Sequence, residues 1–138
     1  LYSDMSCTLP LIQIKGRSML DLATTYDIID CQTGTNLGSA KRNFMKSIIK
    51  DSWTVNDASG NPYAQFIEDS IAILRRFIPL IPAKYHFEIA GQPQILMQQR
   101  FNPFVKRTDI MIPADHPLDR RVIAAVALLS SAIEGRQG

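Results

Sequence analysis

Three stretches of the chain share one pattern, in which alternating apolar and polar positions lead to a glycine-containing turn and then resume. The stretches are residues 26–42, 53–68 and 85–100, and their turns contain Gly34, Gly60 and Gly91. Each stretch opens on an aromatic residue, and an alternation with a period of two is typical of a strand with one buried face. The turn residues tolerate or fix turn dihedral angles. The pattern therefore predicts three β-hairpins, which are degenerate copies of one unit.

Four further stretches have the composition of strands. They are residues 9–17, 43–50, 70–78 and 104–113, although residues 67–77 could also form a short helix. Together with the hairpins they give about ten strands, which is close to the number that closes a small barrel.

The last stretch, residues 118–134, has a different character and reads LDRRVIAAVALLSSAIE. No polar residue occurs between Val122 and Leu129, so a helix here is apolar on every side and has to be buried. This run is shorter than the roughly 20 apolar residues that a bilayer span needs. The sequence therefore predicts a buried core helix rather than a membrane helix.

The predicted helix covers about residues 117–134. Asp115 or His116 can cap it, and Pro117 suits its first turn. Arg120 and Arg121 lie at the positive end of the helix dipole, which is unfavourable unless Asp115 or Asp119 pairs with them. A single buried helix after a series of strands predicts a mainly β fold, in which a closed antiparallel barrel of about 10–12 strands encloses the hydrophobic C-terminal helix.

The bulk composition limits the function more than it defines it. A length of 138 residues with 46% hydrophobic content fits one compact domain over residues 1–138. The net charge of +2 is too small for a global field that steers the chain to nucleic acid. Cys7 and Cys31 show no metal-type spacing; they could pair with one another, but we expect two free thiols in a reducing cytosol.

The repeated units YDIIDCQTG, WTVNDASGNPYAQF and YHFEIAGQPQ, followed by the LDRRVIAAVALLSSAIE helix, resemble the tubby C-terminal-like superfamily. The similarity is to its LURP-one-related and phospholipid-scramblase-like branch and covers roughly residues 9–135. The resemblance implies a twelve-stranded barrel around a central helix. Tubby-like domains bind phosphoinositide head groups, and scramblases are associated with bilayers, calcium and palmitoylation. The chain lacks a palmitoylation-type cysteine cluster and an EF-hand-like loop, which argues against calcium-dependent scrambling.

Basic residues are the best candidates for a binding site. The candidate lipid- or phosphate-binding residues are Lys41, Arg42, Lys46 and Lys50, which lie within ten positions, and the pair Arg75 and Arg76. A further group comprises Arg100, Lys106 and Arg107. Basic side chains beside exposed aromatics favour an anionic membrane surface, at about 1 kcal/mol per charge. The alternative is that these residues are solvated outer faces of strands, where they also discourage edge pairing.

Catalysis has little support in the sequence. His86 and His116 belong to no local nucleophile motif, and the glycines are isolated turn residues rather than a phosphate loop. Metal-ligand spacing is absent, so we expect no metal and no cofactor. The leading hypothesis is a non-enzymatic cytoplasmic module that binds anionic phospholipid head groups peripherally at the membrane. The alternative is a protein-interaction or regulatory scaffold without lipid binding, and nucleic acid is the weaker choice. The sequence leaves the oligomeric state open.

Overall fold

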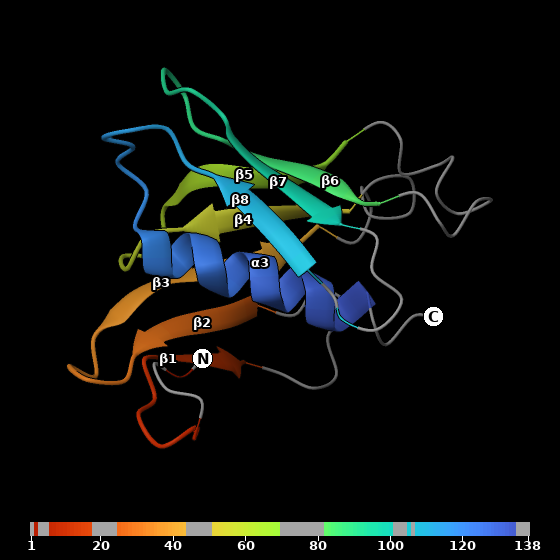
Figure 1. Ribbon diagram of the computed structural model, residues 1–138. Coiled ribbons are helices and arrows are strands. Elements are labelled where there is room, and N and C mark those ends of the chain that lie inside the picture. The colour runs from red at the N-terminus through yellow and green to blue at the C-terminus, as the bar shows by residue number, and fades with distance from the viewer. Residues whose placement is uncertain are drawn as a thin grey trace. The chain divides into compact units, whose positions relative to one another are not determined.

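The computed structural model describes residues 2, 6–17, 25–43, 51–69, 82–100, 105 and 107–134. Within these ranges the chain forms strands and a C-terminal helix, shown in chain order by colour in Figure 1. The elements are β1 (Ile12–Gly16), β2 (Thr25–Asp30), β3 (Asn36–Arg42), β4 (Ser52–Asn56), β5 (Pro62–Glu68), β6 (Lys84–Glu88), β7 (Ile95–Arg100), β8 (Arg107–Met111) and α3 (Arg120–Glu134). The eight strands form one sheet in the order β1-β2-β3-β4-β5-β6-β7-β8, so each strand lies beside its neighbour in sequence.

The three predicted hairpins are confirmed as β2–β3, β4–β5 and β6–β7. Their turns contain Gly34, Gly60 and Gly91, each with a positive φ that a residue with a side chain rarely adopts. In the first two turns Asp30 and Asp57 each accept, on Oδ1, a hydrogen bond from the backbone N–H two residues ahead, at 2.8 and 2.9 Å. This is the usual way in which aspartate stabilises a turn.

Closure of the barrel is not seen in the described strands. Two of the other predicted strands are confirmed as β1 and β8, whereas those over 43–50 and 70–78 fall on residues 44–50 and 70–81, outside the described ranges. Within the described residues, β1 and β8 are the two ends of the strand order, and closure requires them to pair. The mainly β class is therefore confirmed, and the expected closed barrel of about 10–12 strands is corrected, over the described residues, to an open eight-stranded meander.

The chain divides into two compact units with separate sets of buried side chains. Unit 1 comprises Leu1–Lys41, Val55–Pro62 and Pro117–Gly138, and unit 2 comprises Arg42–Thr54 and Tyr63–His116. Unit 1 buries Ile12, Ile28, Ala40 and Val55 from its strands, and unit 2 buries Trp53, Ala64, Phe66, Ala83, Tyr85, Phe87, Ile95 and Met97. These residues alternate along the strands, as the sequence pattern predicts. A single domain over residues 1–138 stays a prediction.

Helix α3 begins after Asp119 rather than at Pro117. Asp119 is its N-cap, because its Oδ1 accepts a hydrogen bond from the backbone N–H of Arg121 at 2.8 Å. The expected caps, Asp115 and His116, are wrong because the helix begins at Arg120, which places both residues too far before its N-cap position. The unfavourable position of Arg121 at the positive end of the helix is offset by Asp119, since the Arg121 Nη2 lies 2.7 Å from its Oδ2.

Most of the apolar side chains of α3 are buried, as expected. Val122, Ile123 and Val126 are exposed by 1% or less. Two apolar residues of the helix are exposed, Leu128 by 46% and Ala132, although a helix that is apolar on every side was expected to be buried all round. The helix contacts β1 within unit 1 (Figure 1). No helix in the described ranges is long and apolar enough to cross a bilayer.

Candidate functional site

The structure describes two of the six candidate lipid-binding residues. Lys46, Lys50, Arg75 and Arg76 lie outside the described ranges. Lys41 is exposed near the end of β3, whereas Arg42, the next residue, points to the opposite side of the strand and is half-buried. That the six residues form one binding surface stays a prediction.

Arg42 is held by a buried network in unit 2. Its Nε donates a hydrogen bond to Oδ1 of Asp51 at 2.9 Å, and its guanidinium carbon lies 6.0 Å from the centroid of the Trp53 ring. The backbone N–H of Asp51 in turn donates to Oε2 of Glu68 at 3.2 Å. Removing one partner of such a buried pair leaves an uncompensated charge. Arg42 is therefore a structural contact of β4, and Lys41 is the more accessible of the two for a ligand.

Lys41 shares an exposed face with two basic residues that the sequence analysis did not single out, Lys15 and Arg17. The register places Lys15 opposite Asp27 and Lys41 opposite Thr25 across β1, β2 and β3. Because side chains alternate along a strand, Lys15, Asp27 and Lys41 lie on the same side. We call Lys15, Arg17, Asp27 and Lys41 the β1–β3 face. The sequence signal that could have identified this face is the spacing of Lys15 and Arg17, which lie two positions apart within the strand predicted over residues 9–17.

The charges of the β1–β3 face are centred on one ion pair. Arg17 Nε lies 3.1 and 3.0 Å from the two carboxylate oxygens of Asp27, and its Nη2 lies 2.7 Å from Oδ1. These hydrogen bonds, with a smaller contribution from the charge of Lys15, hold the pKa of Asp27 below its usual value. Both partners are thus charged at neutral pH. Three cations share one carboxylate on this face, which leaves it net positive.

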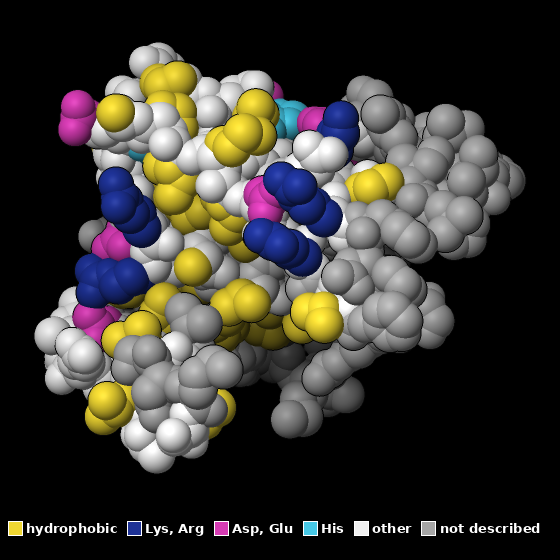
Figure 2. Space-filling view, in the orientation of Figure 1, with side chains coloured by type: hydrophobic (Ala, Val, Ile, Leu, Met, Phe, Trp, Pro, Cys, Tyr) yellow, Lys and Arg dark blue, Asp and Glu magenta, His cyan; other side chains and the backbone are white. Residues whose placement is uncertain are grey.

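A second exposed face lies on β7 and β8 in unit 2. The register pairs Leu96 with Met111, Gln98 with Asp109 and Arg100 with Arg107, and we call these six residues the β7–β8 face. Asp109 accepts a hydrogen bond from Nε of Arg100 and lies 3.9 Å from Nε of Arg107. Figure 2 shows basic side chains (dark blue) next to acidic ones (magenta) rather than a continuous basic surface.

His86 lies beside this face and contacts two carboxylates. Its Nδ1 is 2.7 Å from Oδ1 of Asp69, and its Nε2 is 3.0 Å from Oε1 of Glu88. The contacts connect the residue after β5 to β6, so a structural role accounts for His86. Within the described residues, no three His, Cys, Asp or Glu side chains are grouped in a way that could hold a metal ion.

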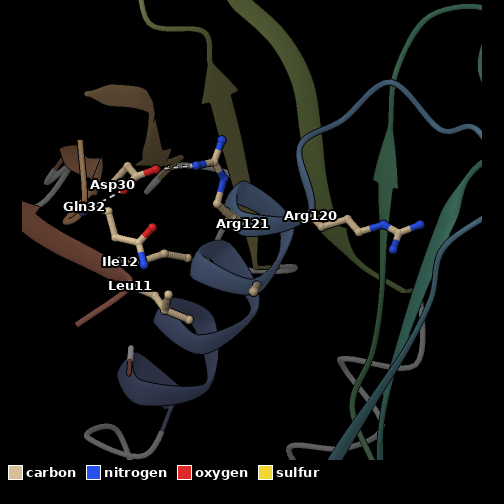
Figure 3. A pocket seen from close by; sticks show the side chains of 7 residues that line it. Leu11, Ile12, Asp30, Gln32, Arg120 and Arg121 are labelled. Atoms are coloured by element: carbon tan, nitrogen blue, oxygen red, sulfur yellow. Dashed lines mark hydrogen bonds and ion pairs between the residues drawn. The ribbon is translucent and has the colours of Figure 1, made fainter. Parts of the chain in front are cut away.

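A cleft of about 230 Å³ opens in unit 1 beside the start of α3 (Figure 3). Its lining residues are Leu11, Ile12, Asp30, Gln32, Arg120, Arg121 and Ala124. Figure 3 shows the side chain of Arg121 directed at Asp30, whereas that of Arg120 extends away from the cleft. The cleft is therefore an apolar hollow with one ion network at its edge.

The polar groups at the edge of the cleft satisfy one another. Nη1 of Arg121 donates to Oδ2 of Asp30, and its Nε and Nη2 donate to Asp119. A hydrogen bond from the backbone N–H of Gln32 is the main reason why the pKa of Asp30 is lowered, and the charge of Arg121 adds to it. The network ties the start of α3 to the end of β2. Since the carboxylates of Asp30 and Asp119 both have lowered pKa values and stay ionised, neither is suited to act as a general acid at neutral pH.

No family model matches the chain, and no curated protein or solved structure matches it. The resemblance to tubby-like proteins therefore stays a proposal, and the function has to be argued from the geometry of the chain itself.

Proposed function

We propose that the chain is a non-enzymatic binding module, of the tubby-like and LURP-one-related kind, that attaches to anionic phospholipid surfaces from the cytoplasm. The observation that carries the proposal is the β1–β3 face, where Lys15 and Lys41 flank the Arg17–Asp27 pair on the exposed side of neighbouring strands. A lysine near an anionic membrane contributes about 1 kcal/mol. Two such charges support weak and reversible attachment.

Two further features support the proposal. Arg121 at the edge of the cleft is paired with Asp30 and Asp119, which favours a structural role for these three residues over catalysis. The four predicted basic residues outside the described ranges would add to the attraction wherever they face the membrane, since each cation near the surface contributes separately.

The proposal is tested by flotation of the protein with phosphatidylcholine vesicles that contain or lack phosphatidylserine. We expect the parent protein to float with the anionic vesicles only, and less so as salt rises, because surface charges are screened over about 8 Å at physiological ionic strength. The double variant Lys15→Gln/Lys41→Gln should float less. Lys84→Gln, which removes an exposed lysine from β6, is the matched control and should behave as the parent.

The predicted basic cluster provides a separate arm of the same experiment. A variant in which Lys46, Lys50, Arg75 and Arg76 are all changed to Gln should also reduce flotation with little change in melting temperature. If the parent protein binds no vesicle of either composition, or binds without any dependence on salt, the membrane proposal is wrong.

The second candidate function, a protein-interaction scaffold, is favoured by a different observation. The β7–β8 face exposes two large apolar side chains, Leu96 and Met111, next to one another on a ladder that also carries exposed arginines. Adjacent exposed apolar side chains are typical of interaction surfaces rather than of solvated sheet faces.

A further inference from the structure

The β7–β8 face brings two like charges directly opposite one another. Arg100 and Arg107 are cross-strand partners, and their side chains are 66% and 72% exposed. Like charges in this position destabilise an antiparallel ladder. One carboxylate, that of Asp109, serves both guanidinium groups, and it contacts each through Nε. Within the described residues, the terminal guanidinium nitrogens of both arginines therefore remain available to an external acceptor.

The same face presents an apolar pair at its other end. Leu96 and Met111 are cross-strand partners that are 44% and 55% exposed. They lie four residues along the strands from the arginines, which is about 14 Å at the rise of a β-strand. The even spacing places both pairs on the same side of the sheet, with Gln98 between them. A ligand that uses the whole face must therefore carry an anionic group and an apolar group about this distance apart.

We propose that the β7–β8 face binds an extended segment of a partner protein, which places a carboxylate between Arg100 and Arg107 and an apolar side chain on Leu96 and Met111. The planar guanidinium group donates two parallel hydrogen bonds to a carboxylate, so two opposed arginines offer a specific set of donors to one carboxylate. A second anion also relieves the repulsion between the two arginines. This site is independent of the membrane attachment proposed for the β1–β3 face.

The surrounding charges favour a protein segment over a bilayer. Asp109 lies within the face, and two charged residues of the neighbouring strand β6 lie on the same side of the sheet. Lys84 is exposed and paired with Gln98, and Glu88 is two residues from His86, which is paired with Leu96. Glu88 is itself exposed. Around the two arginines, the carboxylates of Asp109 and Glu88 outnumber the one cation, Lys84, so the surroundings disfavour a uniformly anionic membrane surface. A protein segment can place its acidic group on the arginines alone, so it meets the mixed charges of the face without this penalty.

The test measures binding of a dye-labelled synthetic peptide to the full chain by fluorescence anisotropy. The probe carries a glutamate and a leucine four residues apart in a serine-rich, strand-compatible sequence. We expect saturable binding that is lost when the glutamate of the probe is replaced by glutamine. Arg107→Gln and Met111→Gln should each weaken binding by about fivefold or more, because each removes one of the two anchor points.

Arg17→Gln is the matched control, since Arg17 is a comparably exposed arginine that already holds the carboxylate of Asp27. It should bind the probe as the parent does. Arg107→Gln should melt at the same temperature as the parent or higher, because it removes a like-charge pair. If Arg107 had only a structural role, the same substitution would lower the melting temperature. The proposal is overturned if the probe does not bind, if Arg17→Gln weakens binding equally, or if anionic vesicles and not the peptide bind in an Arg107-dependent manner.

Discussion

The β1–β3 face and the β7–β8 face are both exposed sides of antiparallel ladders, but they arrange their charges in opposite ways. On the β1–β3 face a lysine is directly opposite an aspartate, and Arg17 closes a bidentate pair with that same aspartate. On the β7–β8 face two arginines are directly opposite one another, and their shared carboxylate lies one row further along the ladder. The first arrangement is locally satisfied, whereas the second leaves the terminal guanidinium nitrogens without an acceptor among the residues that the structure describes.

The difference predicts different kinds of ligand for the two faces. The remaining charge of the β1–β3 face resides on Lys15 and Lys41, and a lysine acts as a point charge on a flexible stem. Such charge suits a diffuse anionic surface. The β7–β8 face instead offers planar forks beside an apolar pair, which suits one discrete anion and its apolar neighbour. The strand register, more than the number of basic residues, therefore determines which kind of ligand each face suits.

The largest expected effect comes from breaking the strand that carries Lys41. Gly38 of β3 has a φ of 144° and lies at an irregularity in the β2–β3 register, and a Cβ there would collide with the carbonyl oxygen of Asn56. Gly38→Ala should lower the free energy of unfolding by about 2 kcal/mol or more, because the collision is with backbone that cannot move aside. Urea denaturation measures the change.

The matched control for this prediction is Gly91 in the β6–β7 turn. It also has a positive φ, but a Cβ there meets nothing within 4 Å. Gly91→Ala should therefore cost only the backbone strain, about 1 kcal/mol. If Gly38→Ala is as stable as the parent, or if the two variants lose the same stability, then β3 does not pack closely against Asn56 at this position.

A smaller effect is expected from the ion pair of the β1–β3 face. The pKa of Asp27 is lowered mainly by its hydrogen bonds to Arg17. As the pH falls, Asp27 is therefore protonated at a higher pH in the unfolded chain than in the folded chain. The stabilisation from the pair is therefore present above about pH 4, the usual aspartate pKa, and is lost as the pH falls through the lowered value.

The variant Asp27→Asn removes this titration. Its melting temperature should fall less steeply than that of the parent between neutral and strongly acidic pH, and the two proteins should converge at the acidic end. Because the pair is near the surface, the difference at neutral pH should be small and should shrink in high salt. Parallel acid profiles for the two proteins would show that the pair does not stabilise the fold.

Local features of the sequence were sufficient to predict the hairpins and the helix, but not their long-range contacts. Gly34, Gly60 and Gly91 define turns through their own dihedral freedom, and alternation identifies the strands on either side. Closure depends instead on pairing between β1 and β8, which no local pattern encodes. The helix cap was misplaced because several residues before the helix can cap it, and the contacts of Asp119 with Arg121 select among them.

The candidate sites were predictable only in part for a similar reason. Lys41 was found because basic residues cluster around it in sequence. Lys15 and Arg17 were missed because they join Lys41 through the register of β1, β2 and β3 rather than through proximity in the chain. The exposure of Arg100 and Arg107 followed from the sequence pattern, but their direct opposition depends on the β7–β8 register.

The most direct test of the account maps the membrane-contacting residues by nuclear magnetic resonance on the isotope-labelled full chain. Backbone amide signals are compared with and without bicelles that contain phosphatidylserine, and with neutral bicelles as the reference. We expect the changes to centre on Lys15, Arg17 and Lys41, to occur with anionic bicelles only, and to spare Leu96 and Met111. Changes confined to Leu96 and Met111, or identical changes with neutral bicelles, would contradict it.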